Sequence, residues 1–382
     1  MRINRLRLDN WRNFRAVDAP LQKRVFLVGP NASGKSNFLD SLRFLQDLAI
    51  DGGGLREAVN RRRGVAKIRC LAARRPPDVA IKAEIVDDSE KSAVWTYHVV
   101  FNQDNNSRPI VKQEFVARGG ETLLQRPDKD DRADPERLTQ THLEQVNANK
   151  EFRPIVELFR SIRYLHIVPQ LVRDPGRYVA KDKDPFGGDF LEQVVRTTPK
   201  TASARFRAIA AVLQAAVPQL KEVKIERDET TGEPHLMGRF ENWRPGAGWQ
   251  REDQFSDGTL RMIGLLWAVF EGSGPLLLEE PELSLHAGVI RHLPQMFAKV
   301  ARKKGRQIII STHSPELLSD PGIAPDEVLM LQPDAEGTRV GTAANDAEIV
   351  ALLEGGLSIA DVVIPKTAPP NAEQLAFSFE SD

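Results

Sequence analysis

The sequence has little of several features that mark particular protein classes. Its 382 residues include one cysteine, Cys70, which excludes an internal disulfide and a cysteine-ligated metal site and fits a reducing compartment. Lysine plus arginine and aspartate plus glutamate both number 53, so the chain carries no net charge. A nucleic-acid surface would therefore have to be a local patch.

Long apolar runs are also missing. No run approaches the roughly 18 residues needed to cross a bilayer, and the first residues lack the three regions of a signal peptide. We therefore expect a cytoplasmic protein without a membrane partner. The length exceeds the usual limit of a single core, which predicts two lobes or one domain with insertions.

The most specific motif that is present is a phosphate loop at residues 29–36. It reads Gly-Pro-Asn-Ala-Ser-Gly-Lys-Ser, and the apolar residues 24–28 supply the strand that such a loop must follow. The glycines let backbone N–H groups point at a phosphate chain, Lys35 adds a positive charge, and Ser36 opens a helix whose dipole favours anions. The motif predicts ATP or GTP binding; the alternative is a glycine-rich turn.

A phosphate loop needs a partner acid, and residues 274–282 supply one at the end of an apolar strand. We expect Glu279 to hold Mg²⁺ through water beside Ser36, and Glu280 to polarise the attacking water. Glutamate replaces the usual aspartate at the first of these positions. The alternative is a strand that ends in surface acids.

A second apolar strand, residues 306–312, is followed by His313. Such runs suit a parallel sheet covered on both faces, and ligands bind beyond the carboxyl ends of its strands. We therefore expect His313 near Lys35 and Glu280, where it could contact the γ-phosphate. A structural histidine is the alternative.

Residues 254–261 read Gln-Phe-Ser-Asp-Gly-Thr-Leu-Arg and directly precede an apolar segment. Taken alone, they predict the start of a helix with Ser256 and Asp257 as capping residues. Together with the other motifs, they resemble the signature loop of ABC-type ATPases. The resemblance implies that Ser256 and Gly258 engage the γ-phosphate bound by the opposite subunit.

The order of phosphate loop, signature, acidic strand and histidine resembles the ABC ATPase superfamily in its RecF and SMC-like branch. Residues 255–258, 280–286 and 311–315 look like the AAA15/AAA_21 subgroup, which includes the overcoming-lysogenization-defect ATPases. The opening residues 3–14 are similar to that branch's first strand and the turn near the nucleotide. The resemblance implies catalytic roles for Lys35, Glu280 and His313, and nucleotide contacts from Arg12, Asn13, Gly29, Asn31, Ser33, Gly34, Lys35, Ser36, Asn37, Ser256 and Gly258.

The fold class implied is α/β: a P-loop NTPase with an ABC-type two-lobed head, an antiparallel β-meander and a short helical arm. Alternating residues 79–86, 94–101 and 110–116 predict the meander. We expect an N-terminal lobe over 1–170, with a mobile charged insertion at 118–150, an arm over 171–222, a C-terminal lobe over 223–364 and a flexible tail over 365–382.

The passage from strand 162–168 into the arm resembles that of RecF. It makes Gln170 the candidate for sensing Mg²⁺ and the attacking water; an ordinary loop glutamine is the alternative. A basic stretch follows the phosphate-loop helix and could contact the DNA backbone, or be a solvated surface; it contains Arg56, Arg61, Arg62, Arg63, Lys67, Arg69, Arg74 and Arg75. Residues 374–379 resemble a sliding-clamp peptide, with a tail folded onto its own head as the alternative.

We expect a homodimer that closes on ATP and opens on hydrolysis, since each subunit would supply half of the other's site. Two functions are possible for such an ATPase. The first is a DNA-repair or DNA-maintenance ATPase, which the arm passage and the basic stretch favour. The second is a defence ATPase that senses or scaffolds for a separately encoded effector nuclease. A transporter subunit fits the signature and acidic phrases less well.

Overall fold

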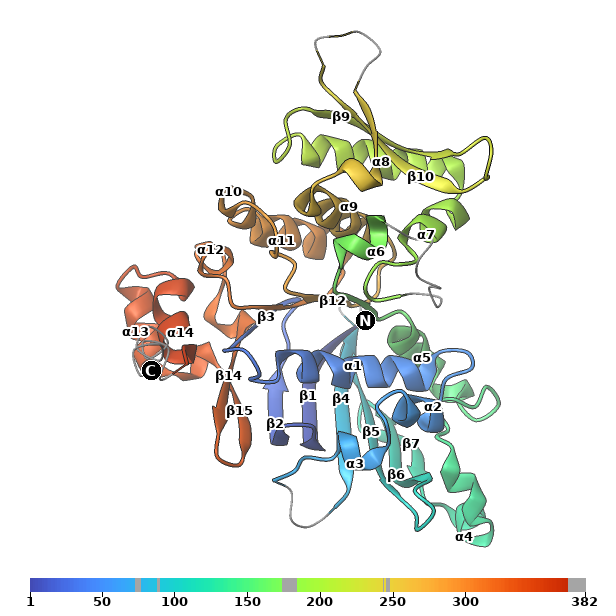
Figure 1. The fold of residues 1–382 in the computed structure, drawn as a ribbon. Helices are drawn as coiled ribbons and strands as arrows, with labels where there is room; N and C mark the ends of the chain where they lie inside the picture. The colour runs from blue at the N-terminus through green and yellow to red at the C-terminus, as the bar shows by residue number, and fades with distance from the viewer. Residues whose placement is uncertain (73–76, 88–89, 174–183, 243, 245–247, 370–382) are drawn as a thin grey trace, which may run out of the picture. The chain divides into compact units, whose positions relative to one another are not determined.

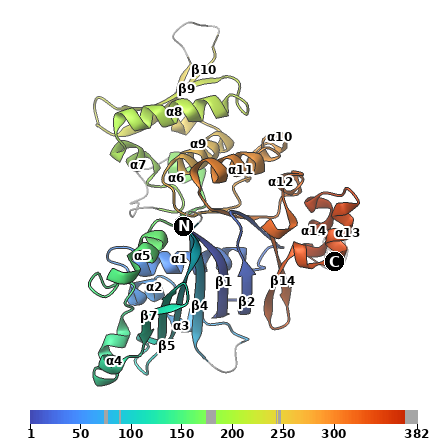
Figure 2. The ribbon, with the colours of Figure 1, turned by 180° about the vertical axis from the view of Figure 1, so that it is seen from behind.

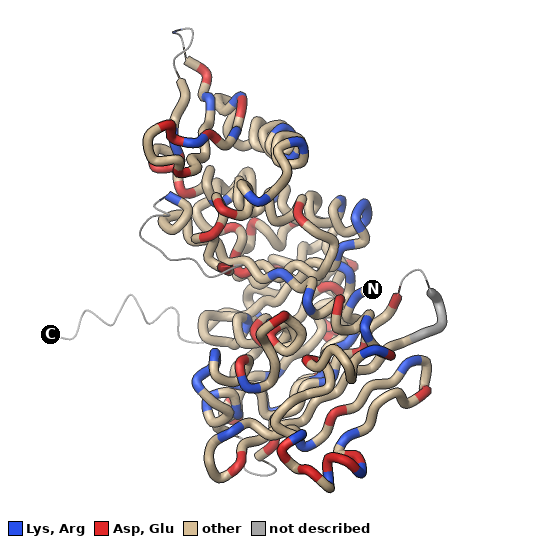
Figure 3. Tube along the Cα trace, turned by 90° about the vertical axis from the view of Figure 1, so that its right-hand side faces the viewer, with Lys and Arg blue, Asp and Glu red and all other residues tan. Residues whose placement is uncertain are grey.

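The computed structural model describes residues 1–72, 77–87, 90–173, 184–242, 244 and 248–369. The chain forms two compact units. The first contains Met1–Arg163, Ser273–Leu277 and Pro294–Asp382, and the second contains Tyr164–Gly272 and Leu278–Leu293. Each unit is therefore assembled from segments far apart in sequence. Acidic and basic residues are interspersed along the chain (Figure 3).

An antiparallel sheet of six strands, in the order β2-β1-β4-β5-β6-β7, forms one part of the first unit (Figure 1). The expected meander corresponds to β4, β5 and β6, whose pairings are antiparallel. Alternating burial along β4 gives the sheet one face for the core. The strands are β1 Arg2–Trp11, β2 Phe14–Pro20, β4 Val79–Asp87, β5 Glu90–Gln103, β6 Pro109–Arg118 and β7 Glu121–Arg126.

A second six-stranded sheet has the order β15-β14-β3-β13-β12-β8. Its strands β3 and β13 pair in parallel, and every residue of both is buried. Their continuous apolar sequences fit a sheet covered on both faces. The strands are β3 Arg24–Val28, β8 Arg163–Leu165, β12 Leu276–Glu279, β13 Ile308–Thr312, β14 Val328–Asp334 and β15 Gly337–Thr342.

Helix α1 (Lys35–Ala49) contacts strand β1 of one sheet and strand β13 of the other. Phe38, Leu42 and Leu45 repeat at helical spacing and are fully buried. This helix thus links the core of the first unit to the phosphate loop that precedes it. The unit also contains α2 Leu55–Asn60, α3 Val65–Ile68, α4 Lys129–Ala133, α5 Arg153–Arg160, α11 Leu293–Lys304 (which starts at the boundary), α12 Pro315–Leu318, α13 Ala347–Glu354 and α14 Ile359–Thr367.

The charged segment 118–150 folds, where its composition predicted a mobile insertion. Its Arg126 side chain is fully buried and hydrogen-bonds Asp131 at 2.8 Å and Glu114 at 3.1 Å. Burial raises the pKa of Glu114, whereas the hydrogen bond from Arg126 lowers the pKa of Asp131. The prediction was wrong because the buried Arg126 ties this segment to the fold through Glu114 and Asp131, although its other charges, such as Lys129 and Glu136, face water.

The second unit combines helices with a small antiparallel sheet in the order β11-β10-β9 (Figure 2). Helix α9 contacts both α6 and α8, and α8 packs on β9. Thr197 and Thr198 separate α7 from α8, which begins at Pro199. The elements are α6 Pro169–Arg173, α7 Phe190–Arg196, α8 Pro199–Leu213, β9 Leu220–Arg227, β10 Pro234–Phe240, β11 Trp249–Arg251, α9 Asp257–Phe270 and α10 Ala287–Ile290.

Near the C-terminus, α14 runs to Thr367, past the expected start of the tail at residue 365. The clamp-like residues 374–379 lie outside the described residues. None of the helices in the described part is long and apolar enough to cross a membrane. The predicted lobe and arm boundaries stay a prediction.

Candidate nucleotide site

The phosphate loop connects β3 to α1 in the first unit. Gly34 precedes the helix with φ of 98°, in the left-handed region that favours glycine. A Cβ at Gly34 would lie 2.2 Å from Asn13 Nδ2, so a side chain cannot be added without displacing Asn13. The second glycine of the motif is therefore required by both its dihedral angle and its neighbour.

Asn13 supports the loop from the turn between β1 and β2. Its Nδ2 donates to the backbone oxygen of Ser33 at 2.9 Å and to Thr338 Oγ1 at 2.8 Å, and its Oδ1 accepts from Asn37 Nδ2 at 2.7 Å. Two predicted nucleotide contacts, Asn13 and Asn37, are thus joined to the loop and to each other. The sequence did not reveal Thr338, which lies 325 residues away from Asn13.

Lys35 curls over the loop, and its Nζ donates to the backbone oxygens of Gly29 at 2.8 Å and Pro30 at 3.1 Å. Ser33 Oγ is buried without a hydrogen-bond partner among the described residues. A Cβ at Gly29 would lie 2.6 Å from that hydroxyl. Buried polar groups normally have partners, so an orphaned hydroxyl in a glycine-lined loop fits a phosphate ligand. Asn31 and Ser36 are exposed beside it.

Arg12 occupies the same turn as Asn13, with φ of 54°. Its Nη2 lies 3.2 Å from Asp40 Oδ2 on α1, and its Nη1 donates to the backbone oxygen of Lys67 at 3.0 Å. The guanidinium is therefore held against α1. Its contact with a nucleotide stays a prediction.

His313 directly follows β13, whose last residue, Thr312, pairs with Val28 at the end of β3. Val28 is the last residue before the phosphate loop, so the strand ahead of His313 lies beside the strand that leads to the loop. The histidine side chain is exposed. Its contact with the γ-phosphate stays a prediction.

The acid Glu279 belongs to the second unit, where Tyr164 contacts it. The Tyr164 hydroxyl donates to Glu279 Oε2, and His166 Nδ1 lies 3.3 Å from the Glu279 backbone oxygen. A phenol that donates a hydrogen bond to a carboxylate fixes the orientation of that carboxylate. The sequence reasoning missed Tyr164, because no local pattern links residues 115 positions apart.

Glu280 has φ of 43°, a left-handed conformation that is uncommon for residues other than glycine. Arg261 of α9 is 7% exposed, and its Nε and Nη1 have no hydrogen-bond partner within the described part of the chain. Burial lowers the pKa of Arg261, opposed by the charges of Asp257, Glu282 and Glu280. A buried cation thus acts electrostatically on the acids that follow β12; the sequence reasoning treated it only as part of the signature.

Ser256 caps α9, and its Oγ accepts from Thr259 N at 3.2 Å, so the predicted helix start is confirmed. A Cβ at Gly258 would lie 2.6 Å from the Ser284 backbone oxygen, so the signature packs closely on the segment after the acids. Gln170 Nε2 donates to Asp257 Oδ2 at 3.3 Å. The second unit therefore brings Gln170 to the start of the signature helix.

The proposed Mg²⁺ donors are a hydroxyl (Ser36), a carboxylate (Glu279) and an amide (Gln170). Oxygen donors of this kind suit Mg²⁺, which nucleotide sites hold through one or two protein groups plus phosphates. No group of three or more His, Cys, Asp or Glu residues with the geometry of a metal site occurs among the described residues. The donor chemistry therefore fits a nucleotide-bound Mg²⁺ better than an all-protein metal cage.

Residues 24–319 match the model of the family AAA_21, described as "AAA domain, putative AbiEii toxin, Type IV TA system". The match covers more than half of the chain and includes the phosphate loop, signature, acidic strand and His313. The chain belongs to this family. A search of curated proteins found no match.

Solved structures of Smc heads have the same fold. One is described as the SmcHead bound to the C-winged helix domain of ScpA; it is 13% identical, with a TM-score of 0.51 over 90% of this chain and 97% of that one. Another is the Smc head domain with an extended coiled coil, bound to the C-terminal domain of ScpA, from Pyrococcus furiosus. It is 11% identical, with a TM-score of 0.52 over 92% and 99% of the two chains. The protein therefore has the P-loop NTPase fold of ABC-type ATPase heads.

Proposed function

We propose that this AAA_21 protein hydrolyses ATP and that ATP binding brings two copies together. The observation that carries the proposal is the phosphate loop. Its glycines, its buried Ser33 hydroxyl and the folded-over Lys35 form a cradle for an anion in front of α1. Family membership supports a nucleotide as that anion.

The residues divide the work of hydrolysis. Loop N–H groups and Lys35 bind and orient the phosphates, and Glu280 accepts a proton from the attacking water. His313 contacts the γ-phosphate. Mg²⁺, held by Ser36 and through water by Glu279 and Gln170, would neutralise charge that develops on the phosphates. Tyr164 orients Glu279 for this role.

Ser256 serves the site of the other copy in this proposal. Its Oγ lies at the N-terminus of α9, where the hydroxyl and the helix dipole suit a γ-phosphate. Two copies related by a two-fold axis would then form two composite sites.

The shared site can be tested by mixing two inactive variants, Glu280→Gln and Ser256→Arg. A mixed dimer has one intact site, since one copy supplies Glu280 and the other supplies Ser256. An equal mixture should regain about a quarter of wild-type turnover, because half of the dimers are mixed and each has one of two sites intact. A mixture that stays as inactive as each variant alone contradicts the shared site.

We further propose that the ATPase acts on DNA. Part of the basic stretch is unavailable for this, because Arg62 is buried against Asp40 and Asp47. Arg63, Lys67 and Arg69 are exposed and support sequence-independent contact with phosphates. The test is ATP turnover with and without single-stranded, duplex and gapped DNA. Stimulation that disappears in an Arg63→Glu, Lys67→Glu variant supports this role.

The second candidate is a defence ATPase that works with a separately encoded effector nuclease. The family description, which names a putative toxin of a toxin–antitoxin system, favours it. Turnover that no DNA stimulates, together with co-purification of a nuclease, would support this role over the first.

A further inference from the structure

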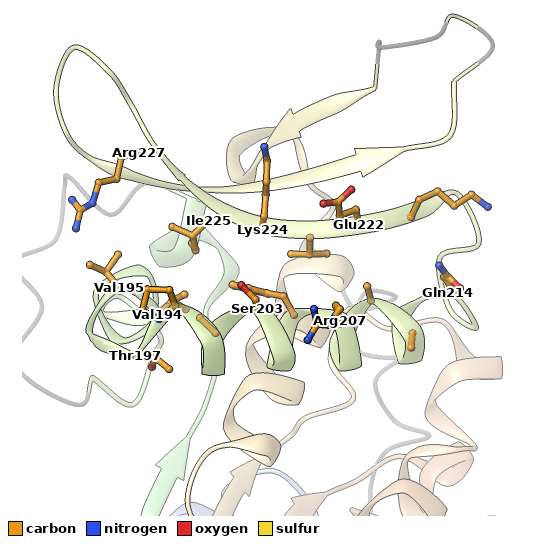
Figure 4. A pocket seen from close by; sticks show the side chains of 17 residues that line it. Val194, Val195, Thr197, Ser203, Arg207, Gln214, Glu222, Lys224, Ile225 and Arg227 are labelled. Carbon is orange, nitrogen blue, oxygen red and sulfur yellow. The ribbon is translucent and has the colours of Figure 1, made fainter.

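A groove with a volume of about 770 Å³ runs between α8 and β9 in the second unit (Figure 4). One wall is a stripe along α8 at helical spacing, which includes Ala202, Phe206 and Ala210. The other wall is formed by consecutive residues of β9, including Val223 and Ile225. The side chains of both walls are therefore apolar over much of the length of the groove.

Within the described part of the chain, strand β9 is an edge strand, since the sheet order is β11-β10-β9. Residues from both of its faces line the groove, Glu222 and Lys224 from one, Val223 and Ile225 from the other. The groove therefore follows the edge of the strand. An edge without a neighbouring strand is a template for an added strand, and the alternate pockets beside it select side chains.

The charges of the groove favour an acidic occupant. Four cations line it, Arg207, Lys221, Lys224 and Arg227, against the single acid Glu222. Lys221 and Lys224 lie 3.0 Å and 2.8 Å from Glu241 and Glu226, and Glu222 lies 3.3 Å from Arg239 on the neighbouring strand. The positive charge of the groove therefore comes mainly from Arg207 and Arg227. An extended segment with apolar residues at alternate positions and acids around them would match both the apolar walls and the basic residues of the groove.

We propose that this groove binds residues 373–382 of a second copy of this chain, as a strand added to β9. Leu375, Phe377 and Phe379 alternate along that segment, Glu373, Glu380 and Asp382 flank them, and it contains no lysine or arginine. Its alternating part, residues 373–379, is close in length to the eight residues of β9. In the added strand, Leu375, Phe377 and Phe379 would face α8, and the acids would lie near Arg207 and Arg227.

We assign the segment to a second copy because a mutual exchange of segments gives a closed dimer. Two copies that each insert this segment into the other's groove form a two-fold dimer with no site left over. This contact goes beyond the proposed function and requires no nucleotide. Its tests are therefore run without ATP, and their outcome is independent of the ATP-dependent dimer.

The first test uses a fluorescent peptide of residues 371–382 and the full chain carrying Phe377→Asp and Phe379→Asp, so that its own segment cannot compete. Saturable binding by anisotropy is expected. A peptide of the same composition with the alternation scrambled should bind at least about tenfold more weakly. Equal binding of both peptides contradicts strand addition.

The second test locates the site on the same full-length background. Arg207→Glu with Arg227→Glu should weaken binding of the wild-type peptide by about tenfold, because like charges then face its acids. Lys200→Glu, an exposed charge reversal on α8 outside the groove, is the matched control and should leave binding unchanged. Unchanged binding to the Arg207, Arg227 variant rules out this groove.

The third test asks which copy supplies the segment. Without nucleotide, the wild-type chain should sediment as a concentration-dependent dimer, and the Phe377→Asp, Phe379→Asp chain as a monomer. Peptide binding by a wild-type chain that is monomeric at every concentration overturns the exchange between copies. A pull-down in which the peptide binds a sliding clamp but not this protein overturns the proposal as a whole.

Discussion

Asn13 shows how much of the phosphate loop depends on one side chain outside it. Three hydrogen bonds tie Asn13 to Ser33, Asn37 and Thr338, and its amide fills the space beside Gly34 where a Cβ would go. The motif predicts a glycine there for the sake of the ligand. The structure adds a second reason, which is the packing of the turn between β1 and β2 against the loop.

Gly34→Ala should therefore lower ATP affinity by more than about tenfold, since it combines a left-handed φ with a clash at Asn13. Gly52→Ala is the matched control: its φ is 71°, but nothing lies within 4 Å of the added Cβ. It should cost about 1 kcal/mol of stability and leave nucleotide binding intact. Titration with a fluorescent ATP analogue measures the affinity of both variants. Equal losses of affinity in the two variants would show that the clash is irrelevant.

Tyr164→Phe tests whether the phenol positions Glu279. Losing the hydrogen bond to a charged group should weaken Mg²⁺-dependent nucleotide binding by about threefold to tenfold. Nucleotide binding in excess chelator should not change, because the phosphate loop belongs to the other unit. Titrations with and without Mg²⁺ separate the two effects. An unchanged Mg²⁺ requirement would mean that Tyr164 only packs.

At the scale of elements, Arg62 joins the turn after α2 to α1. Its two Nη atoms lie 2.7 Å from Asp40 and Asp47, and its guanidinium lies 5.0 Å from the centre of the Phe44 ring. Burial raises the pKa of Asp40, but the charge and hydrogen bonds of Arg62, helped by Arg43 and Arg12, outweigh it and leave the pKa below its usual 3.8. One arginine of the basic stretch, Arg62, is thus a buried ion-pair partner and is not part of the surface.

Arg62→Met should destabilise the protein by about 3 kcal/mol, because Asp40 and Asp47 lose their buried partner and keep only the more exposed Arg12 and Arg61. Arg63→Met, at an exposed neighbour, should change stability by less than about 0.5 kcal/mol. A lowered pKa contributes stability above about pH 4, and this contribution disappears as the pH falls through the folded-state value. The difference between wild type and Arg62→Met in urea unfolding should therefore be largest near neutral pH and shrink below pH 4. A difference that grows with acid would contradict the ion-pair explanation.

The elements themselves were predictable to the extent that local sequence controls them. Alternation in residues 79–116 predicted the meander, and the apolar runs before Gly29 and His313 predicted β3 and β13. The segment 118–150 was not predictable. The buried Arg126 holds it in place by pairing with Asp131 of the same segment and with Glu114 on another strand. No periodicity in sequence encodes such a pairing.

At the scale of the whole molecule, Glu280→Gln should bind ATP but fail to hydrolyse it, since the amide cannot accept a proton from the water. If two copies close on ATP, this variant should accumulate as a dimer. The measurement uses the Phe377→Asp, Phe379→Asp background, so that the nucleotide-independent exchange does not contribute. Light scattering of Glu280→Gln on this background should give twice the mass with ATP that it gives without it, and Lys35→Ala, which loses the phosphate-binding charge, should stay in its nucleotide-free state. A Glu280→Gln protein on this background whose mass is unchanged by ATP would reject closure on ATP.

The sequence by itself determined the motifs of the ATPase. Its motifs carry their chemistry in residues that are adjacent along the chain, because a phosphate loop, an acidic strand end and a helix cap are each local. They predicted the P-loop fold and the family, and both are confirmed.

Tertiary structure alone decided which side chains support those motifs and which charges remain available. Asn13 is paired with Thr338, Glu279 with Tyr164, and Arg62 with the carboxylates of α1. These choices depend on contacts between residues far apart in the chain, where burial makes each partner costly to lose. The same reason explains the groove beside β9: its edge and the facing stripe of α8 become one surface only after the chain has folded.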